Sequence, residues 1–80
     1  MKALTENQVL LLKEIEKNST KTVTSLVNKV ARATRIPLST LKLNARMLKK
    51  FGLVEYDNSN PVGLTESGVF ILSILRGESG

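Results

Sequence analysis

The stretch Ile36 to Tyr56, IPLSTLKLNARMLKKFGLVEY, decides the fold of this chain. Pro37 stands near its start, and a basic amphipathic segment follows. After Gly52, apolar and polar residues alternate. Proline suits the start of a helix, and glycine suits the left-handed residue that ends one. Leu41, Ala45 and Leu48 are spaced so that all three lie on one helical face. The stretch therefore predicts a helix over about residues 38–50, followed by a strand.

The positive charge of the chain is concentrated in its central part. The 80 residues include 12 Lys or Arg and 7 Asp or Glu, which gives a formal net charge of +5. The segment from Lys17 to Val54 holds nine of the cations and no carboxylate. A surface that only kept the protein soluble would mix the two signs, whereas a one-sided positive field is typical of a protein that binds a polyanion. Because this segment coincides with a helix-turn-helix pattern, nucleic acid is favoured over a solubilising face.

The composition argues against catalysis. The chain has no cysteine and no histidine, so it lacks thiolates, imidazole bases and the usual ligands of zinc. The 7 carboxylates are scattered along the sequence and form no acid–base pair, and no glycine-rich phosphate loop is present. We therefore expect a protein that is not an enzyme and has no metal site and no cofactor.

Length and the terminal segments predict one small cytoplasmic domain. Residues 1–80 are enough for a single domain with a small core, which a partner subunit would stabilise. Glu6 and Asn7 interrupt the N-terminal segment before an apolar run develops, so we expect no signal peptide. The apolar run Val69 to Leu72, which no other run exceeds in length, is too short to cross a bilayer. The absence of cysteine agrees with a reducing cytosol.

Two further helices are expected before the central stretch. Thr5 to Gln8 has the pattern of a capping box and predicts a helix over about residues 6–17. Thr22–Val23 is expected to form a short strand. Thr24 is a good N-cap, which predicts a second helix over about residues 25–34.

A hairpin and a last helix are expected after the central stretch. Residues 58–61, Asn-Ser-Asn-Pro, are a dense turn signal between strands predicted at 53–57 and 62–64. Thr65 is a good N-cap for a final helix over about residues 66–76. The expected fold class is α+β and mostly α.

The order of these elements and three motifs resemble the winged helix-turn-helix family. The motifs are Ser39-Thr40, Leu48–Val54 and Leu64–Gly68; the last resembles the junction after the wing in MarR-like regulators. The whole chain resembles the small single-domain winged-helix proteins of archaea and their viruses. The resemblance implies a three-helix core, a two-stranded β-hairpin wing and a C-terminal helix. The chain departs from the family at the wing, where Glu55 and Asp57 are present and no cation is.

The resemblance also implies which residues contact DNA. The start and outward face of helix 38–50 would enter the major groove, where the fork of Arg46 suits the O6/N7 edge of guanine. Leu43 suits a thymine methyl group, with a partly buried core position as the equal alternative. The expected base-contacting residues are Ser39, Thr40, Lys42, Leu43 and Arg46.

Five further cations are expected to contact phosphates, with plain solvated charge as the alternative. These are Lys29, Arg32, Arg35, Lys49 and Lys50.

The final helix has more apolar residues than one core needs. A helix that packs on one side is about half apolar, whereas Ser73 is the only polar residue between Val69 and Leu75. Either the helix is sunk in its own domain or it forms a two-fold dimer interface with the first helix, and we favour the interface. Its expected residues are Leu10, Leu11, Phe70, Ile71, Ile74 and Leu75.

These observations together predict a sequence-specific transcription regulator that binds double-stranded DNA as a homodimer. The alternative is a winged-helix adaptor that binds other proteins in a larger complex, because a fold does not fix a function.

Overall fold

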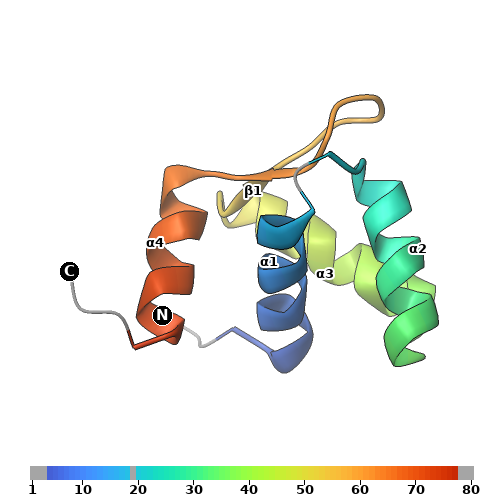
Figure 1. Cartoon of the computed structure of the whole chain (residues 1–80), viewed down its shortest axis with the longest axis horizontal. Coiled ribbons are helices and arrows are strands. Elements are labelled where there is room, and N and C mark those ends of the chain that lie inside the picture. Colours follow the sequence, from blue (N-terminus) through green and yellow to red (C-terminus); the bar gives the residue numbers. More distant parts are fainter. Residues whose placement is uncertain (1–3, 19, 78–80) are drawn as a thin grey trace.

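The computed structural model describes residues 4–18 and 20–77. Their elements are α1 (Glu6–Lys17), α2 (Val23–Thr34), α3 (Leu38–Lys50), β1 (Val54–Glu55), β2 (Gly63–Leu64) and α4 (Glu66–Leu75). Four helices with one antiparallel hairpin make the mostly helical α+β winged-helix architecture that the sequence predicts (Figure 1). Within the two described ranges, no helix is long and apolar enough to span a membrane.

Helix α1 begins with the capping box that the sequence predicts. The hydroxyl of Thr5 accepts a hydrogen bond from the Gln8 amide at 3.2 Å, and the Gln8 side chain accepts one from the Thr5 amide at 3.1 Å. Each bond satisfies a backbone donor that a helix start would otherwise leave without a partner. The Gln8 side chain can therefore be buried without cost to its hydrogen bonding.

Helix α2 begins earlier than the sequence predicts, and the expected strand at Thr22–Val23 is wrong. Thr22 rather than Thr24 is the N-cap, since its hydroxyl accepts a hydrogen bond from the Ser25 amide at 3.3 Å. The wing still reaches this segment, but only where the Val62 amide donates to the Lys21 carbonyl at 2.9 Å. One such bond does not make a strand, and Thr22 serves instead as the N-cap of α2.

Helix α3 has the predicted bounds and the predicted end. It follows Pro37 without a side-chain cap, and Gly52 adopts a φ of +76° after its last turn. Without a Cβ, glycine adopts this left-handed conformation at little cost. The turn lets the Leu53 amide donate to the Leu48 carbonyl at 3.0 Å, which directs the chain from α3 into the wing.

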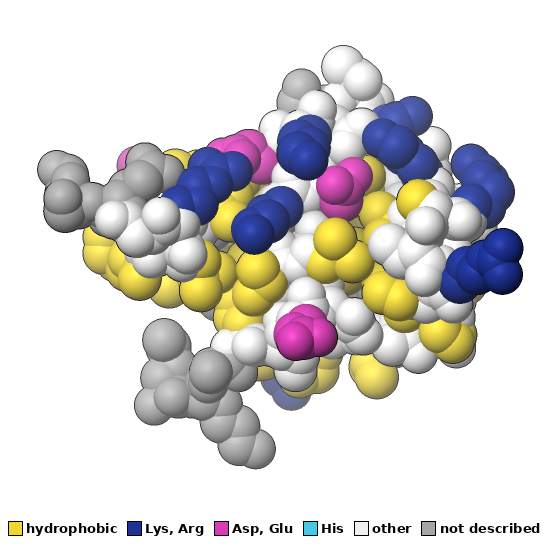
Figure 2. Space-filling model, turned by 60° about the horizontal axis from the view of Figure 1, so that its bottom comes forward, with side chains coloured by type: hydrophobic (Ala, Val, Ile, Leu, Met, Phe, Trp, Pro, Cys, Tyr) yellow, Lys and Arg dark blue, Asp and Glu magenta, His cyan; other side chains and the backbone are white. Residues whose placement is uncertain are grey.

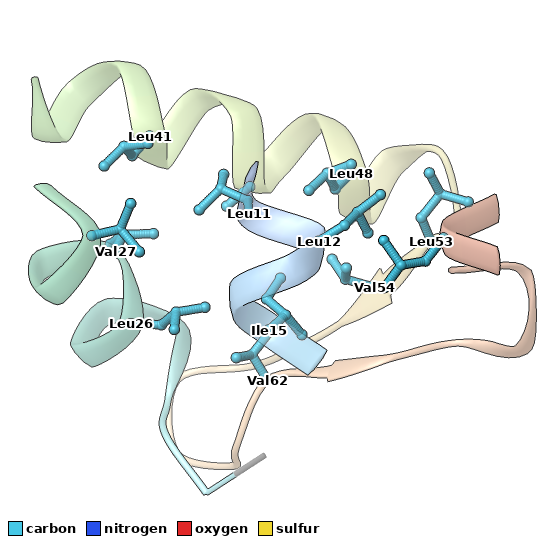
Figure 3. Packing of buried hydrophobic residues seen from close by; sticks show 13 residues of the cluster. Leu11, Leu12, Ile15, Leu26, Val27, Leu41, Leu48, Leu53, Val54 and Val62 are labelled. Carbon is cyan, nitrogen blue, oxygen red and sulfur yellow. The ribbon is translucent and has the colours of Figure 1, made fainter. Parts of the chain in front are cut away.

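Helix α1 lies at the centre of the core. In Figure 1 it stands between α2 and α4, with α3 behind it, and it packs against all three of them and against β2. Figure 3 shows the side chains of α1 pointing toward Leu41 and Leu48 of α3 on one side and toward Val62 on the other. The buried hydrophobic residues are Leu11, Leu12, Ile15, Leu26, Val27, Val30, Leu41, Ala45, Leu48, Leu53, Val54, Val62 and Leu72.

The wing is shorter than the sequence predicts. Only Val54 pairs with Leu64 and Glu55 with Gly63. Beyond these pairs the carboxylate of Asp57 accepts hydrogen bonds from the amides of residues 59 and 60, at 2.9 and 2.7 Å. These bonds curl the chain into a turn before the strands can pair further, so most of the expected ladder is replaced by a loop.

Candidate nucleic-acid interface

The outward face of α3 carries the residues that the sequence predicts to contact bases. Leu41, Ala45 and Leu48 hold the inward face in the core. The residues between them lie outside: Ser39, Lys42, Leu43 and Arg46 are exposed and Thr40 is partly exposed. Leu43 is 56% exposed, so its alternative placement in the core is wrong. The helix therefore presents two hydroxyls, two cations and one aliphatic side chain to solvent.

A shallow depression lies between this face and the start of α2. It has a volume of about 150 Å³. It is lined by Val23, Thr24, Val27, Lys42, Ala45, Arg46 and Tyr56. The first N–H groups of a helix have no partner within it and carry partial positive charge, and the first turn of α2 holds no acid to compensate. The first turn of α2 and the two cations Lys42 and Arg46 thus line one depression, so positive charge is concentrated there.

The contribution of α2 and Tyr56 to this depression was not predicted from the sequence. The sequence predicts Thr24 as the N-cap of α2. This prediction places the start of the helix two residues too late, because Thr22 is the N-cap. The signal was present, because Thr22 is also a good N-cap residue. The Val62 amide also donates to the Lys21 carbonyl, so a segment far along the sequence lies beside the start of α2.

The expected phosphate-contacting cations of α2 do not all lie at this depression. At 100° per residue, Lys29 is about 200° around α2 from Val27, which lines the depression. Its ammonium donates to the Asn18 side chain at 3.0 Å, on the flank of α2 that faces the end of α1. Arg32 is exposed, and Arg35 is the left-handed C-cap of α2. The structure therefore separates Lys29 from the surface formed by α3 and the start of α2.

Lys49 and Lys50 at the end of α3 have different surroundings. The Lys49 ammonium donates to the Tyr56 carbonyl at 2.8 Å and lies 4.5 Å from the centre of the Tyr56 ring. These contacts tie α3 to the base of the wing. Lys50 is exposed. Lys50 therefore fits the expected role of a phosphate contact better than Lys49 does.

The wing is acidic. It carries Glu55 and Asp57, both exposed, and no cation. Hydrogen bonds from the backbone amide and side chain of Asn60 and from the Ser59 amide lower the pKa of Asp57 to about 2. Asp57 is therefore fully charged at neutral pH, and the wing tip would repel a phosphate backbone.

Helix α4 exposes apolar surface. Phe70 is 65% and Ile74 54% exposed, and Val69 and Leu75 are about half exposed. On the face drawn in Figure 2, hydrophobic side chains gather on the left, where α4 lies, and most Lys and Arg side chains follow the upper and right margins. Among the described residues, four of the six large hydrophobic side chains that are exposed thus lie on α4; the other two are Leu43 of α3 and Phe51 just after it.

Three of the residues expected in the subunit interface are buried or partly buried within the chain. Leu11 is fully buried within the chain, so its expected place in a subunit interface is wrong: its side chain fills the core between α1 and α3 (Figure 3). Leu10 and Ile71 are partly buried and pack against the same core. Exposed Phe70, Ile74 and Leu75 remain available to a second subunit.

The architecture is similar to a known one. The crystal structure of SSV1 F-93 matches with a TM-score of 0.69 and 16% sequence identity, over 95% of this chain and 92% of that chain. No protein-family model matches the sequence, and a search of the curated proteins finds no match. At this identity the likeness establishes the winged-helix-like fold alone. The narrower resemblance to MarR-like regulators stays a prediction.

Proposed function

We propose that this protein binds double-stranded DNA and regulates transcription, with α3 in the major groove. The observation that carries the proposal is that the exposed cationic face of α3 and the acid-free first turn of α2 line one depression. An α-helix fits the major groove, and a phosphate held at the neighbouring helix start would fix its position along the duplex. The similarity of the fold to SSV1 F-93 supports the winged-helix-like architecture on which the proposal depends.

In this arrangement the side chains of α3 have separate tasks. Arg46 would donate two hydrogen bonds to the O6/N7 edge of guanine, and Leu43 would contact a thymine methyl group. Ser39 and Thr40, at the helix start, would bond phosphate or a base edge. Lys42, at the depression, would contact a phosphate in place of the base that the family resemblance implies, and Lys50 would contact another phosphate; both contacts raise affinity for every sequence alike.

The second part of the proposal is a homodimer formed through α4. Full burial of one apolar side chain contributes roughly 1.5–3 kcal/mol, and the four exposed side chains of α4 are already about half-buried. Four from each subunit would then contribute roughly 6–12 kcal/mol, which is comparable to an association cost of about 4–15 kcal/mol. A dimer at micromolar concentration needs a net gain of about 8 kcal/mol, which corresponds to the favourable end of both ranges, and this is the dimer that we propose. A two-fold axis would place the two α3 helices about one DNA turn apart on a palindromic site.

A second candidate function is a protein-interaction adaptor. The exposed apolar side of α4 and the acidic wing favour it, because both could receive another protein. An adaptor would bind duplex DNA weakly and without preference for any sequence. In neither function does the protein catalyse a reaction or hold a cofactor.

Selection of bound sequences from a random duplex pool tests the proposal. We expect enrichment of one palindromic sequence by the wild-type protein. The variant Lys42→Glu with Arg46→Glu should enrich nothing, because both cations at the depression become acids. Recovery of the unselected pool by the wild-type protein would contradict sequence-specific binding and favour the adaptor.

A further inference from the structure

One hydroxyl joins the end of α3 to the start of α4. The side chain of Thr65 donates a hydrogen bond to the Gly52 carbonyl at 2.6 Å and accepts one from the Gly68 amide at 3.1 Å. The first bond reaches the residue at which α3 ends, and the second caps α4. Thr65 thus holds both helix ends at the same point.

The backbones of the two elements are also in direct contact at this point. The Thr65 amide donates to the Leu53 carbonyl at 3.1 Å. A Cβ atom added to Gly68 would lie 2.0 Å from the same carbonyl oxygen, a separation that no side chain tolerates. The first turn of α4 therefore rests on the backbone of Leu53, and only glycine at position 68 permits the approach.

The segment on which α4 rests is itself part of the end of α3. The Leu53 amide donates to the Leu48 carbonyl at 3.0 Å, and the Gly52 amide donates to the Lys49 carbonyl at 3.0 Å. Besides the packing of both helices on α1, α3 and α4 are therefore joined by backbone hydrogen bonds and by the short side chain of Thr65. Such a junction transmits a rotation of one helix to the other.

We infer that the junction formed by Gly52, Leu53, Thr65 and Gly68 fixes the angle between α3 and α4, and that in the homodimer this angle sets the half-site spacing that the protein prefers. The inference rests on the proposed function. Thr65 and Gly68 are positioning residues, since neither lies on the face of α3 assigned to DNA.

A small change in the angle between α3 and α4 moves the DNA-contacting end of α3 by a large distance. Helix α3 has 13 residues, and at about 1.5 Å per residue it is roughly 20 Å long. A tilt of about 5° at its last turn moves its far end by roughly 1.7 Å, and because both subunits move, their separation changes by up to about 3.5 Å, the rise of about one base pair. A small change at the junction should therefore change the spacing by a whole base pair.

Paired half-sites separated by different numbers of base pairs measure the spacing preference directly. Wild-type protein should prefer one spacing. Gly68→Ala should move that optimum by about one base pair or abolish the preference, with a loss of about tenfold on the wild-type spacing, while its affinity for a single half-site changes little. Thr65→Val, which loses only the hydroxyl, should broaden the preference, and Thr65→Ser, which keeps it, should restore the wild-type optimum.

A distance measurement without DNA provides a second readout. The chain has no cysteine, so Ser39→Cys introduces one spin-label site at the start of each α3. The separation of the two labels in the dimer, measured by pulsed electron resonance, should be narrowly distributed. Gly68→Ala or Thr65→Val should shift or broaden the distribution, and Thr65→Ser should not.

The outcomes separate the inference from the proposed function. Failure of wild-type protein to bind DNA overturns the proposed function. DNA binding with the same optimal spacing and the same label distance in Thr65→Val as in wild type overturns the role of the junction alone. If circular dichroism shows that Gly68→Ala does not fold, the comparison of Thr65→Val with Thr65→Ser decides.

Discussion

Neighbouring residues of one chemical type have different tasks in this protein because their partners differ. Lys49 donates to the Tyr56 carbonyl and lies over its ring, whereas Lys50 is exposed next to it. Leu11 is fully buried in the core, and Leu10 next to it is only partly buried. Residue type and spacing alone do not separate such pairs, and only the contacts of each side chain do.

Arg46 is the residue whose replacement should separate base reading from phosphate binding. Arg46→Ala should cost about 1–3 kcal/mol on a preferred site, because a bidentate contact with guanine is lost, and little on random duplex. Lys50→Ala is the matched control and should weaken both complexes by similar factors. Fluorescence titrations with the two duplexes measure this. Equal losses on both duplexes for Arg46→Ala would identify Arg46 as a phosphate contact and contradict the base assignment.

The carboxyl group of Asp57 should titrate at a low pH. Its pKa of about 2 lies below the ordinary 3.8, because the folded turn donates hydrogen bonds to the charged form. The stabilisation is therefore fully present above about pH 4 and is lost as the pH falls through about 2. Carboxyl carbon shifts measured by NMR against pH give the value. Asn60→Ala removes the side-chain donor and should raise the pKa of Asp57, and an ordinary pKa in the wild-type protein would show that the turn is not formed in solution.

At the scale of elements, the sequence predicted α1, α3 and α4 well because their signals are local. A helix needs a capping residue, a 3.6-residue apolar period and a stop, and each of these lies within a few positions of the others. The start of α2 and the length of the wing were predicted wrongly because they depend on contacts between distant segments or on side chains in the turn. The hydrogen bond from the Val62 amide to the Lys21 carbonyl joins two distant segments beside the start of α2. The Asp57 carboxylate accepts hydrogen bonds within the turn of the wing.

The end of α3 gives a prediction about stability. Gly52→Ala should destabilise the protein by about 1–2 kcal/mol, because a Cβ atom is strained at a φ of +76° although the space around it is open. Gly63→Ala is the control, since Gly63 also has open space and its φ lies outside the left-handed range. Urea denaturation followed by circular dichroism measures both. Equal stabilities of the two variants would contradict a left-handed residue at the end of α3.

At the scale of the whole molecule, the candidate site combines parts that were predictable with parts that were not. The outward face of α3 follows from the spacing of Leu41, Ala45 and Leu48, so its solvent-facing residues could be named from the sequence. The donor end of α2 and the position of Tyr56 could not, because they reach α3 only through the packing of the helices and the wing. For the same reason Lys29, which belongs to the basic part of the sequence, lies on another flank of the folded protein.

The homodimer is tested by changing only exposed residues of α4. Phe70→Glu with Ile74→Glu should convert the protein to a folded monomer, because four charges would face each other across the two-fold axis. The partly buried Ile71 is avoided, since its replacement would also disturb the core. Asn58→Glu with Ser59→Glu adds the same charge at the wing and should leave the dimer intact. Sedimentation equilibrium at tens of micromolar decides, and a wild-type species near 8.8 kDa would contradict the dimer.

The most direct test of DNA binding is the dependence of duplex affinity on salt concentration. Four to six phosphates neutralised by each subunit should make log affinity fall with log salt at a slope of about −4 to −5 per subunit. Titrations of a duplex at several salt concentrations measure this slope. A steep linear fall is the predicted result, and either no binding at low salt or an affinity independent of salt would contradict the proposal that this protein binds DNA.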